Sequence, residues 1–471
     1  MSETRRQPSL GRTRHVHMIG IGGIGMSSIA EVLLSRGYQV SGSDLVTSET
    51  TQHLGARGAR VSEGHSAENV TDADVVVYSS AVDPSTNPEV LEADRRRIPI
   101  IKRADMLGEL MRMQYGVAIA GTHGKTTTTS MTGLVVAEGG FDPTVIVGGK
   151  VAVFGSNAVV GQGDIIVIEA DEYDRAFLRL TPSIAVVTSI DEEHLDIYSG
   201  LGEIKDAFVR FANGIPFFGS AIVCLDDDNV QSIVGRLDRK VVTYGISRQA
   251  VVRADNIERN GMRTSFDVLV EGSVQSRIRL QVPGMHNVRN ALAAYAVGLE
   301  LDIPPRDITE ALGRFSGVRR RFEVLSTTRD IVVVDDYAHH PVEVQATLRT
   351  ATQVWPERRL IAVFQPHLYS RTQDFKNEFA KAFLDADVLV VTDVYGAREE
   401  AIPGVTGSLV ADKAREYGHS DVRYVASVQA LAGVVGRFVK PGDAVIFMGA
   451  GDIWRCTQQL ADELQHRDDS E

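Results

Sequence analysis

The chain has 471 residues, of which 43% are hydrophobic and 24% charged, with a formal net charge of −13. These values are typical of a soluble globular protein of about three domains, and the negative charge argues against general binding to nucleic acid. The two cysteines, Cys224 and Cys456, argue against a disulfide framework or a zinc site and favour a cytoplasmic setting. No apolar run is long enough to be inserted in a membrane, and none follows Arg5 and Arg6 as a signal peptide requires.

The first motif is a glycine-rich turn between a short strand and a helix. Residues 20–25 satisfy G-x-G-x-x-G, residues 27–34 follow as a helix, and residues 38–41 form a second strand. Asp44 stands about twenty positions after the motif, where dinucleotide-binding folds carry an acid that contacts a ribose. The motif predicts a diphosphate at the helix N-terminus. It fits UDP as well as NAD(P), and the rest of the chain disfavours NAD(P).

Two further strands, at residues 73–77 and 98–101, complete this N-terminal unit, and residues 105–113 form a connecting helix. The small polar loop after strand 73–77 lies where ligands bind in such sheets. His65 is expected to be an exposed loop histidine, with a ligand contact as the alternative. The residues predicted to contact a substrate in this unit are Gly22, Gly23, Ile24, Gly25, Asp44 and Ser80.

A second glycine turn follows a buried apolar strand and opens a threonine-rich helix. Its sequence, GTHGKTTTT, is a shortened phosphate loop, because the usual pattern has another glycine where Ile119 stands. The free backbone N–H groups favour an anion, Lys125 adds charge beside the β- and γ-phosphates, and the Thr126 hydroxyl can bind magnesium. A simple turn before a helix would leave Lys125 unexplained. The residues predicted to hold ATP at the loop are Gly121, Thr122, His123, Gly124, Lys125, Thr126 and Thr127.

Two strands after the phosphate loop end in acidic residues. Strand 164–169 ends at Glu169 in the sequence EADEYD, and strand 184–189 leads to His194 in HLD. Neighbouring parallel strands deliver their carboxyl ends to one edge of a sheet, and oxygen ligands suit Mg²⁺. We therefore predict that Thr126, Glu169 and His194 bind Mg²⁺, which Mn²⁺ can replace; an ordinary loop histidine is the alternative for His194.

The rest of the central segment combines strands with a polar helix start. Four strands alternate as in a small antiparallel sheet, at residues 221–225, 241–244, 264–270 and 277–280. A Pro-Gly break then begins a helix with His286 and Asn290 in its first turns. Asparagine is a mediocre helix former, so Asn290 is expected to have a side-chain role such as contact with adenine, with capping as the alternative.

After residues 317–322, which read as a hinge, strands and helices alternate in a third α/β unit. The strands are expected at residues 331–335, 360–364, 388–392 and 444–448. Polar clusters such as DDYAHHP and QPHLYSR follow these strands, as a ligand site at the carboxyl ends of parallel strands requires. Arg371 is suited to anchor a carboxylate, because guanidinium binds carboxylate through two hydrogen bonds.

In order and over nearly the whole chain, these blocks resemble those of the Mur ligases. Besides the motifs above, they include HMIGIGGIGM, SGSD, PGMHNVRNALAA and GVRRRFE. Jointly the blocks are very specific, whereas the first glycine motif alone is weak. The resemblance implies a Rossmann-like UDP-sugar-binding domain at residues 12–113 and a Rossmann-like amino-acid-binding domain at residues 319–471. Between them, residues 114–318 form an ATP-binding domain with a mostly parallel sheet and a small antiparallel one.

The resemblance is greatest to the family branch that joins L-alanine to the lactyl carboxylate of UDP-N-acetylmuramate, using ATP and Mg²⁺, in peptidoglycan synthesis. It implies that Lys125 holds the phosphates, that the predicted metal ligands hold Mg²⁺, and that Asn290 and His286 meet adenine. It also implies that Arg320 contacts a substrate and that Tyr337, His339 and Arg371 line the alanine site. His339 is a candidate for the base that deprotonates the alanine amine.

Two positions depart from the pattern of many relatives. Leu368 stands where many carry arginine, which removes a charge from the alanine site. Sister ligases carry a carbamylated lysine after the HxD motif; Val209 stands near that place and Lys205 is too early, so no carbamate is expected.

Three alternatives remain open: a tripeptide-recycling ligase of the same family, a nucleotide-linked dehydrogenase, and a non-catalytic nucleotide sensor. They differ in the amine accepted, in NAD(P) binding and in phosphate release. The sequence defines neither the oligomeric state nor the selectivity for L-alanine over glycine or L-serine.

Overall fold

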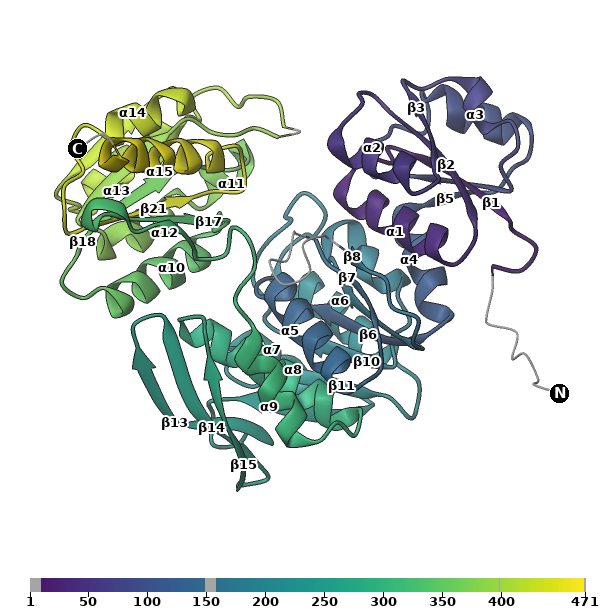
Figure 1. The fold of residues 1–471 in the computed structure, drawn as a ribbon, viewed down its shortest axis with the longest axis horizontal. Coiled ribbons are helices and arrows are strands. Elements are labelled where there is room, and N and C mark those ends of the chain that lie inside the picture. Colours follow the sequence, from purple (N-terminus) through teal and green to yellow (C-terminus); the bar gives the residue numbers. More distant parts are fainter. Residues whose placement is uncertain (1–9, 149–157, 398, 470–471) are drawn as a thin grey trace. The chain divides into compact units, whose positions relative to one another are not determined.

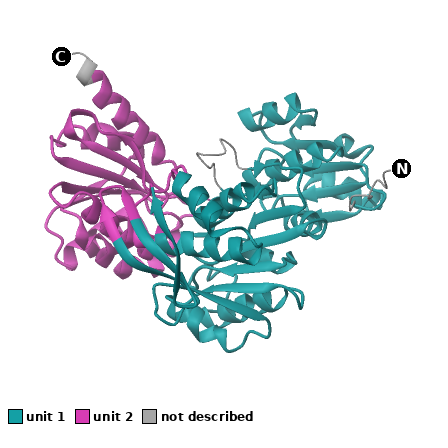
Figure 2. Ribbon diagram, turned by 60° about the horizontal axis from the view of Figure 1, so that its bottom comes forward, with its two compact units in different colours: residues 1–257, 265–280, 288–315 teal, residues 258–264, 281–287, 316–471 magenta. Residues whose placement is uncertain are grey.

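The computed structural model describes residues 10–148, 158–397 and 399–469. The chain forms two compact units (Figure 2). Unit 1 comprises residues 1–257, 265–280 and 288–315, and unit 2 comprises residues 258–264, 281–287 and 316–471. Within the described ranges the strands form three sheets, of five, ten and six strands (Figure 1).

The five-stranded sheet has the order β3-β2-β1-β4-β5, and every pair is parallel. Its strands are β1 (His15–Ile19), β2 (Gln39–Asp44), β3 (Arg60–Glu63), β4 (Val75–Tyr78) and β5 (Ile100–Lys102). Its helices are α1 (Ile24–Ser35), α2 (Glu49–Ala56), η1 (Ala67–Val70), α3 (Pro88–Arg95) and α4 (Arg103–Arg112). The chain runs outward from β1 to one side and then resumes at β4 on the other. The glycine turn after β1 therefore lies at a topological switch point, where such sheets bind ligands.

The ten-stranded sheet has the order β15-β14-β13-β12-β11-β10-β6-β9-β7-β8. Its strands are β6 (Tyr115–Ala120), β7 (Thr144–Ile146), β8 (Ala158–Val159), β9 (Ile165–Glu169), β10 (Ile184–Val187), β11 (Ser220–Cys224), β12 (Lys240–Gly245), β13 (Val252–Asn260), β14 (Arg263–Val270) and β15 (Ser273–Leu280). The helical segments between and after them are α5 (Lys125–Glu138), η2 (Tyr173–Arg179), α6 (Leu201–Asn213), α7 (Asp228–Val234), α8 (Met285–Glu300) and α9 (Pro305–Arg314). Strand β6, which leads into the phosphate loop, pairs in parallel with both β9 and β10.

The predicted small antiparallel sheet is partly wrong. Residues 221–225 and 241–244 correspond to β11 and β12, which pair in parallel with each other, and β11 also pairs in parallel with β10. All five residues of β11 are buried, so its side chains do not alternate between core and solvent. Burial on both faces is typical of parallel strands, whose faces are covered by helices. Strands β13, β14 and β15 extend this same sheet rather than forming a separate one.

The six-stranded sheet has the order β16-β17-β21-β18-β19-β20, with only the β16–β17 pair antiparallel. Its strands are β16 (Glu323–Ser326), β17 (Val332–Asp336), β18 (Arg359–Phe364), β19 (Val388–Thr392), β20 (Val422–Val425) and β21 (Asp443–Met448). Its helices are α10 (Pro341–Val354), α11 (Tyr369–Asp374), α12 (Lys376–Ala382), α13 (Gly407–Glu416), α14 (Leu431–Val435) and α15 (Trp454–Asp469). Three short 3₁₀ turns complete the unit: η3 (Thr328–Asp330), η4 (Phe383–Asp385) and η5 (Val428–Ala430).

The central strands of the ten- and six-stranded sheets are mostly apolar and almost entirely buried, as β6, β10 and β21 show. Such strands place the polar residues that follow them at one edge of their sheet. Among the helices that the structure describes, none combines the length and the apolar character needed to cross a membrane.

Candidate active site

The phosphate loop is the turn between β6 and α5, and its two glycines are required by its geometry. Gly121 and Gly124 have φ angles of +140° and +82°. A Cβ on Gly121 would lie 2.0 Å from Thr188 Oγ1, and a Cβ on Gly124 would lie 2.7 Å from Asn290 Oδ1. Both the positive φ angles and the close neighbours therefore disfavour a side chain at either position.

The segment after β10 fixes the turn from the other side. The Thr122 N–H donates to Ser189 O at 3.0 Å, and the His123 N–H donates to Ser189 Oγ at 2.9 Å. The Asp191 N–H donates to Thr122 Oγ1 at 2.9 Å. Hydrogen bonds within the protein thus fix the shape of the loop, which lowers the entropic cost of holding a phosphate.

Lys125 begins α5, and its ammonium group is surrounded by oxygen atoms. Its Nζ donates to Gly121 O at 2.6 Å, to Thr122 O at 3.2 Å, and to the two Glu172 carboxylate oxygens at 2.8 and 3.0 Å. Burial disfavours the ammonium form, but the Glu172 and Asp171 carboxylates outweigh it and raise the pKa of Lys125. Burial raises the pKa of Glu172 to about 7, and Lys125 opposes that shift. Sequence reasoning grouped Glu172 with the magnesium acids and missed this pairing.

Two of the predicted metal ligands contact each other beside the loop. Thr126 Oγ1 donates to Glu169 Oε1 at 3.0 Å, and the Gly148 N–H donates to Glu169 Oε2 at 2.7 Å. Thr127, the third residue of α5, is buried in the same helical turn. A hydroxyl and a carboxylate next to a phosphate loop form the oxygen donor set that Mg²⁺ prefers.

The third predicted ligand, His194, lies in an acidic group. His194 Nε2 is 3.9 Å from Glu172 Oε1, and the His194, Glu172 and Glu193 ligand atoms all lie within 4.8 Å of one another. His194 also has a φ of +56°. For residues other than glycine this backbone conformation costs about 1–3 kcal/mol, and it often marks a functional position. Carboxylates and an imidazole fit a divalent cation such as Mg²⁺ or Mn²⁺.

The predicted adenine residues fall in different units. Asn290, which is 6% exposed, accepts a hydrogen bond from Thr128 Oγ1 at 3.1 Å and closes on the phosphate loop at Gly124. His286 belongs to unit 2 and packs on Gly284, where a Cβ would lie 2.5 Å from His286 Cε1. Contact of either residue with adenine stays a prediction.

The glycine turn of the N-terminal sheet is also tightly packed. The Gly22 N–H donates to Asp44 Oδ2 at 2.8 Å, so Asp44 braces the turn. A Cβ on Gly25 would lie 2.4 Å from Arg103 Nη1. Arg103, the first residue of α4, therefore lies over the start of α1. A guanidinium at a helix N-terminus adds to the positive potential that favours an anion.

The remaining predicted residues of this site also surround the turn. The Gly23 N–H donates to Gly20 O at 3.2 Å, and Ile24, the first residue of α1, is 54% exposed. Ser80 is exposed in the loop after β4, and the preceding Ser79 contacts the turn, because a Cβ on Gly20 would lie 3.1 Å from Ser79 Cβ. The structure thus brings the ends of β1, β2 and β4 together.

His65 is not the exposed loop histidine that the sequence predicted. Its side chain is only 16% exposed, and its Nδ1 lies 2.9 Å from Ser43 Oγ. The expectation is wrong because the loop that carries His65 is held to the domain by the buried Glu89, which also accepts a hydrogen bond from the Ser66 N–H at 3.3 Å.

In unit 2, Arg320 and Tyr337 lie together at the carboxyl edge of the sheet. The Arg320 guanidinium carbon is 5.0 Å from the centre of the Tyr337 ring, and its Nη2 donates to Gly449 O at 2.6 Å. Arg320 Nε lies 3.3 Å from Asp335 Oδ2. Burial raises the pKa of Asp335 to about 7, while Arg320 opposes that shift. Arg320 also has a φ of +59°.

The other predicted alanine-site residues join this group through His367. The His339 ring lies 5.2 Å from the Tyr337 ring and 5.8 Å from the His367 ring. Arg371 is 7% exposed, and its Nη1 is 3.2 Å from His367 Nδ1. Tyr395 stacks on His367 at 5.8 Å. Sequence reasoning assigned no role to His367 or Tyr395, although His367 shares a motif with Arg371.

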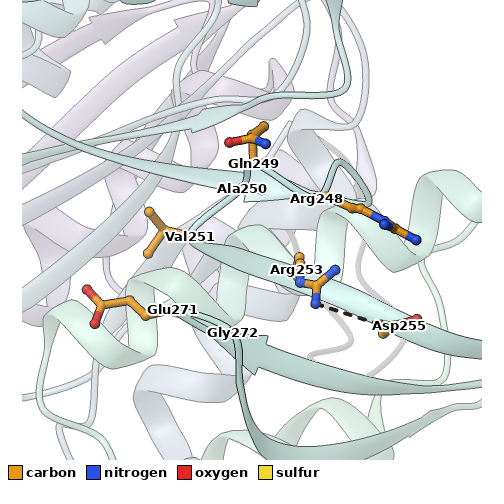
Figure 3. A pocket seen from close by; sticks show the side chains of 8 residues that line it. All are labelled: Arg248, Gln249, Ala250, Val251, Arg253, Asp255, Glu271 and Gly272. Atoms are coloured by element: carbon orange, nitrogen blue, oxygen red, sulfur yellow. Dashed lines mark ion pairs between the residues drawn. The ribbon is translucent and has the colours of Figure 1, made fainter.

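A pocket of about 530 Å³ lies elsewhere in unit 1, at the turns that join β12 to β13 and β14 to β15 (Figure 3). Arg253 and Asp255 form an ion pair there at 3.8 Å. None of the residues predicted from the sequence lines this pocket, so it is no part of the candidate active site.

Comparison with known proteins assigns the class. Residues 15–115 match the model of the Mur ligase family, catalytic domain; residues 119–298 match the Mur ligase middle domain; and residues 320–451 match the Mur ligase, glutamate ligase domain. The chain belongs to the Mur ligase family. The resemblance and the fold class predicted from the sequence are thereby confirmed.

Individual relatives indicate which members of the Mur ligase family this chain resembles. A UDP-N-acetylmuramate–L-alanine ligase of Salinibacter ruber is 62% identical over 466 residues, which cover 99% of this chain and 98% of the relative. The crystal structure of a UDP-N-acetylmuramate–alanine ligase from Thermotoga maritima superposes with a TM-score of 0.80 at 30% identity. The match covers 96% of this chain and 99% of the Thermotoga maritima chain. The structure of a murein peptide ligase from Psychrobacter arcticus has a TM-score of 0.69 at 25% identity. This match covers 96% of this chain and 98% of the Psychrobacter arcticus chain.

Proposed function

We propose that this chain joins L-alanine to the lactyl carboxylate of UDP-N-acetylmuramate and converts ATP to ADP and phosphate, a step of peptidoglycan synthesis. The observation that carries the proposal is the shortened phosphate loop, in which Lys125 lies beside the Thr126–Glu169 pair. The 62% identity to the Salinibacter ruber ligase, across 99% of this chain, supports the choice of substrates.

The chemistry follows from the charges at the loop. The lactyl carboxylate attacks the γ-phosphate, which gives an acyl phosphate and ADP; the alanine amine then attacks the activated carbonyl and phosphate leaves. Lys125 offsets the repulsion between the anionic carboxylate and the anionic triphosphate. Mg²⁺ held by Thr126, Glu169 and His194 supplies further neutralisation of that charge when bound. Lys125 must exchange Glu172 for phosphate oxygens in order to act.

The two substrates are assigned to different sheets. The glycine turn, Asp44 and Arg103 in the N-terminal sheet suit a diphosphate and a ribose. In unit 2, the buried Arg371 suits the alanine carboxylate. His339 Nδ1 lies 2.9 Å from Tyr337 O, so Nδ1 carries the hydrogen of the neutral ring. Nε2 is then the basic nitrogen of that ring. This arrangement supports His339 as the base that deprotonates the alanine amine.

The domain limits, 12–113, 114–318 and 319–471, belong to the same proposal, as does a cytoplasmic location. The structure has Cys224 and Cys456 as free, buried thiols, which suits a reducing compartment.

The test is ADP release measured as a function of both UDP-N-acetylmuramate and L-alanine. We expect release only when both are present, with a much lower rate for a tripeptide. The resemblance to the Psychrobacter arcticus murein peptide ligase makes the tripeptide the appropriate rival substrate. Release that needs the tripeptide, or none with any amine, would contradict the proposal.

A further inference from the structure

A carboxylate that the chemistry above does not use lies just after β11, at the same edge of the ten-stranded sheet as the phosphate loop. The side chain of Asp226 is 9% exposed. Its two oxygens accept from the Ile246 N–H at 2.9 and 2.8 Å, and Oδ1 also accepts from the Ser247 N–H at 2.9 Å. Arg289 Nε donates to Oδ2 at 2.8 Å. Asp226 thus joins the end of β11 to the β12–β13 turn and to α8.

The position of this carboxylate is set by the strands beneath it. Cys224 and Tyr244 are partners in the parallel pairing of β11 with β12, and both are buried. The Leu225 N–H donates to Tyr244 O at 2.7 Å. A Cβ on Gly245 would lie 2.5 Å from Asp226 Oδ1, so the turn closes on the carboxylate only because this residue is glycine. Asp226 is therefore a fixed anchor for Arg289.

The same corner of the sheet also holds the segment that shapes the phosphate loop. Asn229 Nδ2 donates to Ile190 O at 2.8 Å. The neighbours of Ile190 on either side, Ser189 and Asp191, make the hydrogen bonds to Thr122 described above. Residues 226–229 therefore contact one support of the loop directly, and they reach α8 through Arg289.

The contact at Arg289 determines how α8 presents the next residue, Asn290. In an α-helix with 3.6 residues per turn, consecutive side chains point roughly 100° apart, so holding one of them fixes the rotation of the helix and the direction of the other. Asn290 Oδ1 accepts from Thr128 Oγ1 at 3.1 Å and lies where a Cβ on Gly124 would be. A rotation of α8 would therefore move Asn290 away from the loop residue that precedes Lys125.

Stability alone is a weak reason for this ion pair. The Arg289 side chain is 39% exposed, and ion pairs with a solvated partner contribute little to folding. We propose that Asp226 and Arg289 are positioning residues for ATP: by fixing α8 they hold Asn290 against the phosphate loop at Gly124. The inference rests on the proposed function, which supplies ATP as the ligand of this loop.

The test is calorimetric measurement of the Kd for a non-hydrolysable ATP analogue with Mg²⁺, using the full-length protein. We expect Arg289→Met to raise this Kd roughly tenfold to a hundredfold, because a misplaced contact no longer shapes the loop. The Kd for UDP, which is assigned to the N-terminal sheet, should stay unchanged. Arg236→Met is the matched control, because it removes a half-exposed arginine that pairs with Asp206 at 2.6 Å in the same unit, and it should keep the wild-type Kd.

Two double variants separate positioning from a merely structural role. Asp226→Asn should raise the Kd as much as Arg289→Met does, and combining the two should add nothing, because both remove the same contact. In an Asn290→Ala background, which already lacks the positioned side chain, Arg289→Met should have no further effect on the Kd. If Asp226→Asn does not fold, Arg289→Met with and without Asn290→Ala decides the question.

An unchanged Kd in Arg289→Met, an equal rise in Arg236→Met, or an effect of Arg289→Met that persists in the Asn290→Ala background would each overturn the inference. Absence of analogue binding by the wild type would overturn it as well. Failure of the proposed function is detected separately, as absence of alanine-dependent ADP release by a wild-type protein that still binds the analogue.

Discussion

At the scale of single residues, the pairing of Lys125 with Glu172 determines what the phosphate loop can do. The Glu172 side chain is buried and that of Lys125 is only 15% exposed, and the lysine ammonium group is surrounded by two carbonyl and two carboxylate oxygens. A triphosphate must therefore compete with Glu172 for the ammonium group. When one partner of such a buried pair is removed, the other is left without compensation, which typically costs about 3–5 kcal/mol.

We expect Lys125→Met to reduce the rate of ADP release roughly 10²–10³-fold, the cost of losing one electrostatic group at a transition state. It should also lower the free energy of unfolding, because Glu172 loses its counter-ion. The double variant Lys125→Met/Glu172→Gln should recover stability in urea unfolding but not activity. An unchanged rate in Lys125→Met would exclude ATP from this loop.

For Arg371→Ala we expect the KM for L-alanine to rise roughly tenfold to a hundredfold while the KM for ATP stays unchanged, because a buried guanidinium is lost from the site proposed for the alanine carboxylate. Steady-state kinetics with each substrate varied in turn measures both constants. Arg415→Ala removes an arginine that pairs with Asp412 on an exposed helix face and is the matched control. A change in the KM for ATP alone would refute the assignment.

At the scale of elements, the glycine turns set the geometry of the site. We expect Gly124→Ala to destabilise the protein by about 1–3 kcal/mol and to weaken ATP binding, because φ is +82° and Asn290 Oδ1 occupies the space of a side chain. Thermal unfolding and calorimetry measure the two effects. At Gly202 in α6 an added Cβ would meet no atom within 4 Å apart from its own helix backbone and chain neighbours, so Gly202→Ala should be neutral or stabilising by up to about 1 kcal/mol. Equal behaviour of the two variants would contradict this account of the turn.

Buried strands were predictable because they are apolar runs bounded by polar motifs, as β6 and β19 are. The edge strands β3, β16 and β20 were missed, because none of their residues is fully buried and they carry no continuous apolar signal. The direction of β11 was mistaken for a similar reason: short strands carry no direct mark of parallel or antiparallel pairing, and only burial on both faces distinguishes them.

The candidate site was predictable where chemistry and spacing coincide within one motif, as in the phosphate loop. It was not predictable where a contact joins distant segments. The Lys125–Glu172 pair spans 47 positions and the Ser43–Glu89 hydrogen bond spans 46. Nothing local distinguishes Glu172 from its acidic neighbours or shows that His65 is held by a buried carboxylate.

At the scale of the whole molecule, raised carboxyl pKa values make stability depend on pH. Asp335 has a pKa of about 7 in the folded chain, against a usual value of 3.8. Between these values the folded state holds a proton that the unfolded state has lost, so stability falls as pH rises through this window. Asp335→Asn should make the decline in the free energy of unfolding between pH 4 and 7.5 smaller by at most about 4 kcal/mol, as measured by urea unfolding at each pH. Glu172 contributes in the same direction and remains in this variant. Identical pH slopes for wild type and variant would contradict the raised pKa of Asp335.

The net charge of −13 belongs to the same scale, because it opposes the approach of two phosphorylated substrates. Basic groups must therefore be placed locally. Arg103 at the N-terminal glycine turn and Lys125 at the phosphate loop supply positive charge where each phosphate group is expected.

The most direct measurement is a crystal structure with Mg²⁺ and a non-hydrolysable ATP analogue. We predict the triphosphate on the backbone N–H groups of residues 121–127, with Lys125 Nζ moved from Glu172 to the β- and γ-phosphates and the metal beside Thr126 and Glu169. A triphosphate bound at any other place, or a bound triphosphate with Lys125 still held by Glu172, would contradict the account.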